Sequence, residues 1–356
     1  MTQRPASERL RQPSLLDATC DAFARDLAAL TPTLATEVGI GGHDAELQDF
    51  SPEYFDAVAD RIRELLADVD ALNDSTDASD DEDDFDDVDR LTAAMLRARM
   101  SCELDMHYRG EDLRWLNNIE SPVQIIRDSF ELMPKDDAED LENVAARLAK
   151  VRGSLRGYAE SLAEAAAVGR VATHRQIDSV VNQCESLAED GSLLEHLGVE
   201  PESREVTGAK EAFAEFADWL STELSPLAGH EDGVGRERYE LFSAYFLGRV
   251  VDLDEAYSWA REELAATVDE QTQLARRLYG EGTTVLGAYC QLDRDPRYQL
   301  RGTDALMEWM AAVNDEVYRE LAGYEFTAPP GLPPVACAVD RAGSGGIYYT
   351  PPSDDL

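Results

Sequence analysis

The chain has 356 residues, 73 of them acidic and 32 basic, so its formal net charge at pH 7 is −41. This balance excludes nucleic-acid binding through a basic surface, because phosphate contacts need clustered Lys and Arg. Because 44% of the residues are hydrophobic, the sequence predicts a folded acidic protein that buries a core, not a disordered acidic tail.

Lysine is almost missing from the chain. The basic residues are 29 Arg and three Lys: Lys135, Lys150 and Lys210. Carboxylates hold water and cations, and at about 1 M salt the Debye length shrinks to ~3 Å, so that a very acidic surface hardly repels itself. We therefore predict a protein from a salt-adapted, halophilic cell. The alternative is an acidic protein from an ordinary cell.

The sequence shows no targeting or membrane segment. The polar residues 1–13 are not followed by an apolar signal region, and no window reaches 18 uninterrupted apolar residues. We therefore predict a cytoplasmic protein without a membrane partner. The cysteines form no Cys-x-x-Cys pair, which argues against a zinc ribbon or a disulfide scaffold.

Apolar residues recur at helical spacing through most of the chain, which predicts a mainly α fold. We expect a flexible N-terminus over residues 1–14 and a helical body over residues 15–323. Ser51, Pro52 and Glu53 form a helix start, and Asp252 and Glu255 form a capping-box pair. The expected helices cover residues 15–36, 51–72, 88–108, 122–132, 137–167, 176–188, 209–224, 253–279 and 304–322.

Residues 74–89 interrupt the helical pattern with nine Asp and one Glu. They predict a solvated acidic loop. Asp81, Asp83 and Asp86 offer oxygen atoms at a spacing that suits calcium, but the Gly and the closing Glu of a calcium-binding loop are missing. We therefore assign no calcium site.

The last segment, residues 324–356, is rich in Pro and Gly and predicts a small C-terminal β element. Residues 335–339 and 347–350 are its extended runs. Small residues let another backbone approach closely, and an extended strand can pair through its edge. We therefore select Gly345, Gly346, Tyr348 and Tyr349 as a possible peptide-binding edge strand. The alternative is that the two tyrosines cap the core.

The polar residues give no catalytic or metal site. No two of the five histidines (His43, His107, His174, His196 and His230) are three or four residues apart, so no single helix offers a His pair to a metal. No Gly-x-Ser-x-Gly motif is present.

One group of arginines is a candidate for anion binding. Arg236, Arg238 and Arg249 lie close in sequence to Tyr239 and Tyr245, and together they could receive an anionic group. In so acidic a helical protein, the alternative is that these arginines pair with Asp and Glu.

Several segments together resemble a known family. Residues 35–47 (ATEVGIGGHDAEL) with Ser51-Pro52-Glu53, residues 235–239 (GRERY), the helix of residues 254–279 and the stretch of residues 326–352 are similar, in the same order, to the family catalogued as domain of unknown function 885. The resemblance implies a helical zincin-like metallopeptidase body around a cleft. It also implies an edge strand that binds the substrate backbone beside the zinc helix.

In that family the resemblance implies zinc ligands from a helix with His-Glu, followed shortly by Pro-Gly-His-His, and a further acidic ligand downstream. No position in this sequence matches them, so we carry over no zinc ligand, cofactor or catalytic residue. We expect the N-terminal portion of a metallopeptidase-family protein that ends before the zinc motif and is inactive alone. Three explanations are open: a truncated or split gene, a fragment of a longer protein, or a catalytically dead binding protein.

Two kinds of partner are expected from this interpretation. One is a missing C-terminal half or a peptide, and the other is a second copy that associates through uncovered apolar faces. The alternative function is that of a non-catalytic helical peptide- or protein-binding scaffold.

Overall fold

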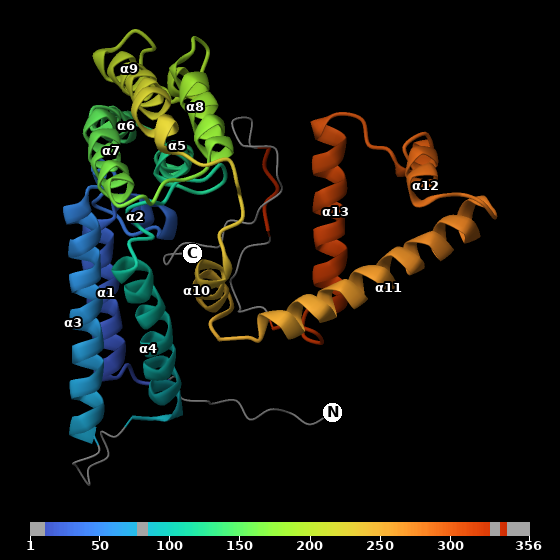
Figure 1. The fold of residues 1–356 in the computed structure, drawn as a ribbon, viewed down its shortest axis with the longest axis horizontal. Helices are drawn as coiled ribbons and strands as arrows, with labels where there is room; N and C mark the ends of the chain where they lie inside the picture. The colour runs from blue at the N-terminus through green and yellow to red at the C-terminus, as the bar shows by residue number, and fades with distance from the viewer. Residues whose placement is uncertain (1–10, 77–84, 328–334, 340–356) are drawn as a thin grey trace. The chain divides into compact units, whose positions relative to one another are not determined.

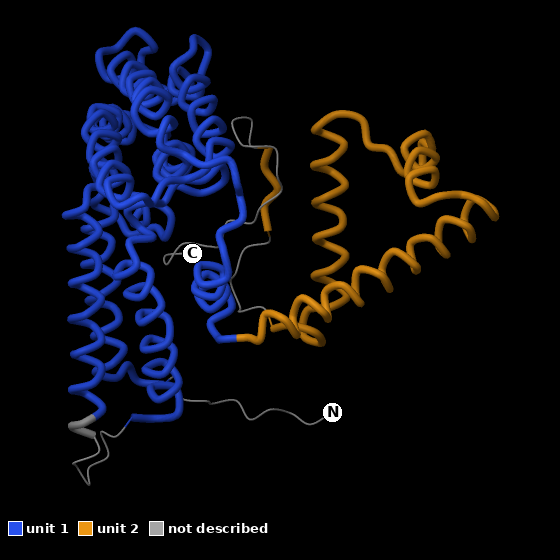
Figure 2. Tube along the Cα trace, viewed as in Figure 1, with its two compact units in different colours: residues 1–250, 352–355 blue, residues 251–351, 356 orange. Residues whose placement is uncertain are grey.

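The computed structural model describes residues 11–76, 85–327 and 335–339, and this part of the chain is mainly α, as predicted (Figure 1). The chain divides into two compact units, with the division between Val250 and Val251 (Figure 2). No helix in the described residues is both long enough and apolar enough to cross a membrane.

Unit 1 contains the longer series of helices. They are α1 (Leu15–Leu30), α2 (Pro32–Val38), α3 (Pro52–Thr76), α4 (Asp87–Tyr108), α5 (Pro122–Leu132), α6 (Ala138–Leu148), α7 (Val151–Ala167), α8 (His174–Ala188), α9 (Arg204–Trp219) and α10 (Arg236–Leu247). A π-helical turn, Leu220–Leu224, continues α9.

Two helices predicted as continuous are broken in the structure. The pattern of residues 15–36 becomes α1 and α2, because Pro32 has no backbone N–H and opens a new helix at its first position. The pattern of residues 137–167 becomes α6 and α7, which Ala149 and Lys150 separate. Apolar periodicity continues across both breaks, so the sequence pattern did not reveal them.

Unit 1 has two hydrophobic cores, and α3 contributes to both. One core is formed by α1, α3 and α4, which lie side by side in Figure 1, and includes Leu16, Leu65 and Leu104. The other core packs α5 to α9 together and takes Phe55 from the first turn of α3. Because α3 starts in one core and continues into the other, its first half borders the junction between them.

The segment before α3 is held by a face of small residues on α7. Ser154 Oγ donates to the carbonyl oxygen of Gln48 at 2.6 Å, and Ser161 Oγ donates to that of Phe50 at 2.8 Å. Between these serines, a Cβ atom on Gly157 would lie 2.3 Å from the carbonyl oxygen of Asp49. Only glycine therefore allows this approach, and the contact fixes where α3 begins.

Phe50 completes this junction in an unusual backbone conformation. It has a φ of 51° and is buried, although non-glycine residues rarely take positive φ. Ser51 then caps α3 as predicted, since its hydroxyl accepts from the backbone N–H of Tyr54 at 3.2 Å.

Unit 2 contains α11 (Leu253–Tyr279), α12 (Val285–Leu292) and α13 (Thr303–Leu321). The side chain of Asp252 caps α11 by accepting from the backbone N–H groups of Asp254 and Glu255. The apolar residues that recur at helical spacing along α13 are exposed, with Trp309 51% and Val317 43% accessible. Periodicity marks an apolar face but does not supply the surface that covers it.

The predicted C-terminal β element is not found in the described residues. They hold one isolated bridge, between Ala322 and Phe326, and residues 335–339 belong to no strand. A run of extended residues becomes a strand only when a neighbouring backbone pairs with it. The candidate edge-strand residues Gly345, Gly346, Tyr348 and Tyr349 lie outside the described residues.

Candidate functional site

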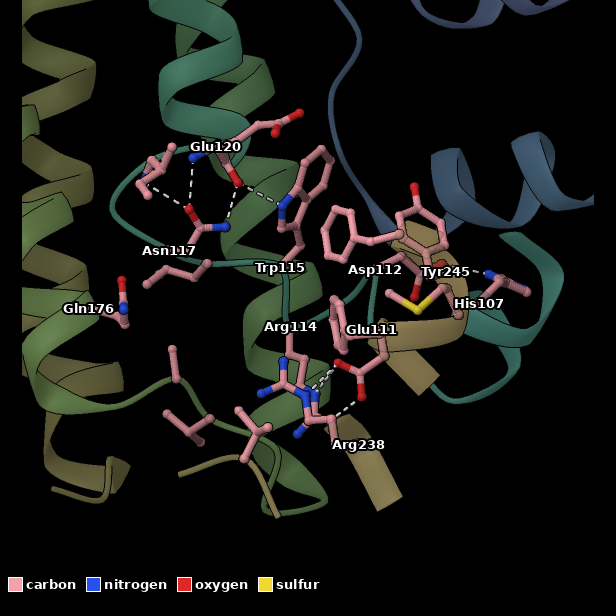
Figure 3. A pocket seen from close by; sticks show the side chains of 18 of the residues that line it. His107, Glu111, Asp112, Arg114, Trp115, Asn117, Glu120, Gln176, Arg238 and Tyr245 are labelled. Carbon is pink, nitrogen blue, oxygen red and sulfur yellow. Dashed lines mark hydrogen bonds and ion pairs between the residues drawn. The ribbon is translucent and has the colours of Figure 1, made fainter. Parts of the chain in front are cut away.

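Unit 1 contains a cleft of about 920 Å³ at the junction of its two cores. Its walls come from the first half of α3, the end of α4, the loop of residues 109–121, the start of α8, the loop before α10, and α10 itself (Figure 3). Apolar side chains that line it are Tyr54, Phe55, Val58, Ile62, Trp115, Leu116, Ile119, Tyr239, Phe242 and Phe246.

A buried carboxylate, Glu111, holds two arginines at this cleft. Arg114 donates through Nη2 to Glu111 Oε1 and through Nε to Oε2, the latter at 2.9 Å. Arg238, on α10, donates through Nε to the same Oε2 at 2.9 Å, and Figure 3 shows both arginines converging on Glu111. The side chain of Glu111 is only 3% exposed.

Arg114 and Arg238 stabilise the ionised form of Glu111. Burial alone would raise its pKa, but the hydrogen bond from Arg114 and the charges of Arg238 and Arg114 outweigh burial, so the pKa lies below its usual value. Glu111 is therefore ionised at neutral pH and fixes the positions of both guanidinium groups.

A histidine and an aspartate lie close together in the cleft near the end of α4. His107 Nδ1 and Asp112 Oδ2 are 2.6 Å apart, and His107 Nε2 is 3.4 Å from Asp56 Oδ1. Burial raises the pKa of Asp112, although the hydrogen bond with His107 partly opposes the shift. The pair joins the loop of residues 109–121 to α4.

Helix α10 forms one wall and buries none of its own residues. Arg99, on α4, contacts α10. The guanidinium of Arg99 lies 4.8 Å from the ring centroid of Tyr245 and forms an ion pair with Glu103 at 3.2 Å. Burial and the neighbouring charge of Glu103 raise the pKa of Tyr245 to about 12. The wall is thus held mainly by polar contacts.

Beside the cleft, a smaller hollow contains two stacked histidines. The rings of His174 and His230 have centroids 4.3 Å apart and planes at 20°. Asp232 accepts from Thr173 Oγ1 and from Arg175 Nε, each at 2.8 Å. These contacts hold the loop before α10 against the start of α8.

The described residues do not fit a zinc ion. No group of three or more His, Cys, Asp or Glu side chains among them is placed to hold a metal. A zinc centre needs at least three protein ligands. We therefore derive no chemical step through zinc.

The structure assigns different places to the arginines selected from the sequence. Arg238 lines the cleft beside Tyr239 and Tyr245, whereas Arg236 forms an ion pair with Glu240 at 2.9 Å and Arg249 is not part of the cleft wall. Pairing with acids, the alternative interpretation, therefore applies to Arg236 and in part to Arg238.

Sequence reasoning missed the loop that supplies most of the polar site. Its residues Glu111, Asp112, Arg114 and Trp115 follow α4 directly. The available signal was a short segment outside any predicted helix that combines acids, an arginine and a tryptophan, which are typical of binding loops.

The fold and the site define a mainly α-helical protein with an aromatic and charged cleft in its first unit. Over residues 32–356 the chain matches the model of a family described as bacterial proteins of unknown function (DUF885), and it belongs to this family. The family resemblance predicted from the sequence is confirmed. A comparison with curated proteins gives no match.

Two solved structures have a similar fold. One, a "putative lipoprotein" from Colwellia psychrerythraea, has a TM-score of 0.65 and 14% identity over 85% of this chain. The other, a "putative lipoprotein of unknown function" from Shewanella oneidensis, has a TM-score of 0.58 and 15% identity over 96% of this chain. The chain spans 58% and 65% of the lengths of these two proteins.

Proposed function

We propose that unit 1 binds an extended peptide in its cleft, and that the chain is the N-terminal, peptide-binding portion of a zincin-like metallopeptidase-family protein. The observation that carries the proposal is the lining of the cleft. Trp115, Tyr239, Phe242 and Phe246 offer apolar surfaces for side chains, while charged and amide groups such as Arg238 and Gln176 lie among them.

This combination suits a peptide for a physical reason. A peptide presents apolar side chains and polar backbone groups in alternation, and a binding cleft satisfies both with aromatic surfaces and a few placed polar groups. The volume of about 920 Å³ lies at the upper end of the range for small-ligand sites, which reaches roughly 1,000 Å³.

Binding can be tested with a defined peptide. Isothermal titration calorimetry in molar KCl would use an N-acetylated, C-amidated hexapeptide of alternating Ser and Phe, and the all-Ser hexapeptide as the control ligand. We expect the Phe peptide to bind and Tyr239→Ala or Phe246→Ala to weaken it about tenfold, since each aromatic ring contributes roughly 1.5 kcal/mol.

The matched control is Tyr257→Ala. Tyr257 is 67% exposed, comparable to Tyr239 at 58%, but it belongs to unit 2 and does not line the cleft. Equal binding of both hexapeptides, or equal weakening by Tyr239→Ala and Tyr257→Ala, would refute peptide binding in this cleft.

We further propose that these 356 residues alone do not hydrolyse peptides, because no position matches the family's zinc ligands. Metal analysis of the purified protein and peptidase assays in molar KCl test this. One bound zinc per chain together with turnover would overturn the proposal.

The second candidate is a non-catalytic peptide- or protein-binding scaffold, which would use the same cleft to hold a partner. The genomic sequence beyond codon 356 distinguishes the two. A following frame with His-Glu and Pro-Gly-His-His favours the metallopeptidase interpretation, and unrelated sequence favours the scaffold.

A cytoplasmic location, predicted because no targeting segment is visible in the sequence, and a salt-adapted source, predicted from composition, remain proposals. The lipoprotein names belong to the two structural neighbours alone. Fractionation of the native cells into soluble and membrane parts, followed by detection of the chain, tests the location.

A further inference from the structure

We propose that Arg114 and Arg238 bind a carboxylate group of the peptide that occupies the cleft. This inference rests on the proposed peptide binding and names the chemical group that the site recognises. It starts from the charge balance of the Glu111 cluster, in which two guanidinium groups share one carboxylate. The cluster therefore carries one net positive charge.

The other acids that line the interior of the cleft have side-chain partners of their own. Asp232 pairs with Arg175, and Glu103 pairs with Arg99. Asp112 has His107 as its partner. Glu120 and Glu231 also line the cleft, but both are exposed at its rim, where solvent and salt screen them. The positive excess is therefore concentrated at Arg114 and Arg238.

The two arginines also keep hydrogen-bond donors for a ligand. A guanidinium has five N–H donors. Arg114 uses Nε and Nη2 toward Glu111, and Arg238 uses Nε. Within the described part of the chain, Nη1 of Arg114 and both terminal nitrogens of Arg238 have no hydrogen-bond partner. Arginine binds carboxylates strongly through such paired donors.

Neighbouring side chains preorganise Arg114 and Arg238 for a ligand. Glu111 holds both side chains in place, so less conformational entropy is lost when a ligand binds. The guanidinium of Arg238 also lies 5.1 Å from the ring centroid of Phe242, which supports it from one side. Both arginines are largely shielded, with side-chain exposures of 19% and 31%, so their contact with an anion is less weakened by salt than that of surface charges.

The carboxylate of a peptide comes from its C-terminus or from an Asp or Glu side chain, and three peptides distinguish these sources. All are N-acetylated hexapeptides of alternating Ser and Phe. The first has a free C-terminal carboxylate, the second a C-terminal amide, and the third an amide with Glu in place of the Ser next to the C-terminus.

Calorimetry in molar KCl then measures the three dissociation constants. We expect at least one carboxylate peptide to bind about tenfold more tightly than the uncharged amide, as one charge-assisted contact permits. A preference for the first peptide identifies the C-terminus, and a preference for the third identifies an acidic side chain.

Arg238→Gln tests the residue that confers the preference. It leaves the Arg114–Glu111 contact in place, so we expect an unchanged melting temperature within a few degrees and a carboxylate-to-amide ratio near one. The matched control is Arg152→Gln on α7. Arg152 has a similar side-chain exposure of 34%, pairs with Glu211 and Glu215, and lies outside the cleft. It should keep the tenfold ratio.

The failures of the two proposals differ. If none of the three peptides binds, peptide binding by the cleft is refuted, and carboxylate recognition with it. If all three bind equally, or if Arg238→Gln keeps the tenfold ratio, peptide binding stands and only the role of the arginines is overturned.

Discussion

Gly157 should tolerate no side chain, although it lies in the middle of helix α7. In Gly157→Ala, the new Cβ would lie 2.3 Å from the carbonyl oxygen of Asp49, and real Cβ atoms approach no closer than about 3.0 Å. The segment before α3 must therefore retreat by about 0.7 Å. That segment is fixed by hydrogen bonds from Ser154 and Ser161.

The magnitude follows from three contributions. Overpacking costs roughly 1–3 kcal/mol, and a weakened serine hydrogen bond costs about 1 kcal/mol. The higher helix propensity of Ala returns about 1 kcal/mol. We expect a net destabilisation of about 2 kcal/mol, which lowers the melting temperature of unit 1 by about 4–8 °C.

The assay is thermal unfolding followed by circular dichroism in molar KCl, with Gly153→Ala as the control. Gly153 lies in the same helix, and a Cβ there would meet nothing within 4 Å, so this variant should be as stable as the wild type or up to about 1 kcal/mol more stable. If Gly157→Ala matched Gly153→Ala, the close contact between α7 and the segment before α3 would be refuted.

Three further predictions concern charge and reactivity. Glu111→Gln should destabilise the fold by about 1–3 kcal/mol at pH 7, because Arg114 and Arg238 lose their shared partner. The pKa of Glu111 is lowered in the folded state. Its contribution to the free energy of unfolding is therefore present above the unfolded pKa of 4.5 and is lost as the pH falls through the folded pKa. A destabilisation by Glu111→Gln that persists unchanged at low pH would contradict this. The melting temperature should rise between about 0.1 M and about 2 M KCl, and a flat or falling curve would refute salt adaptation. N-ethylmaleimide should label the exposed Cys290 in the native protein, while Cys184, which is fully buried and has a raised thiol pKa, should react only after unfolding; mass spectrometry of the digested protein reads this out.

Helix α10 is a wall of the cleft that is attached to unit 1 largely through polar contacts. Helix α10 supplies Tyr239, Phe242 and Phe246 to the wall, yet it buries none of its residues. It is attached through arginine contacts to Glu111 and Tyr245 and through the pair of Arg109 and Glu237, whose atoms are 3.0 Å apart. We therefore expect α10 to open locally at a lower free energy than the two cores.

The sequence by itself determined the helical class, several helix positions and the family. The helix of residues 253–279 has the predicted bounds, because its cap at Asp252 and its end at Gly280 are local signals. The cap at Ser51 was likewise readable. Such features depend on residues within one or two turns, where backbone geometry and side-chain hydrogen bonding act without help from the rest of the chain.

Only the tertiary structure determined which residues form the cleft and which charged groups meet in it. Glu111 and Arg238 are 127 residues apart, and nothing in either local segment indicates that they meet. A glycine inside a helix is unfavourable by propensity alone, and only the carbonyl oxygen of Asp49 packed against Gly157 explains its place in α7. Contacts between distant segments depend on how helices pack, and packing is set by the whole core rather than by local pattern.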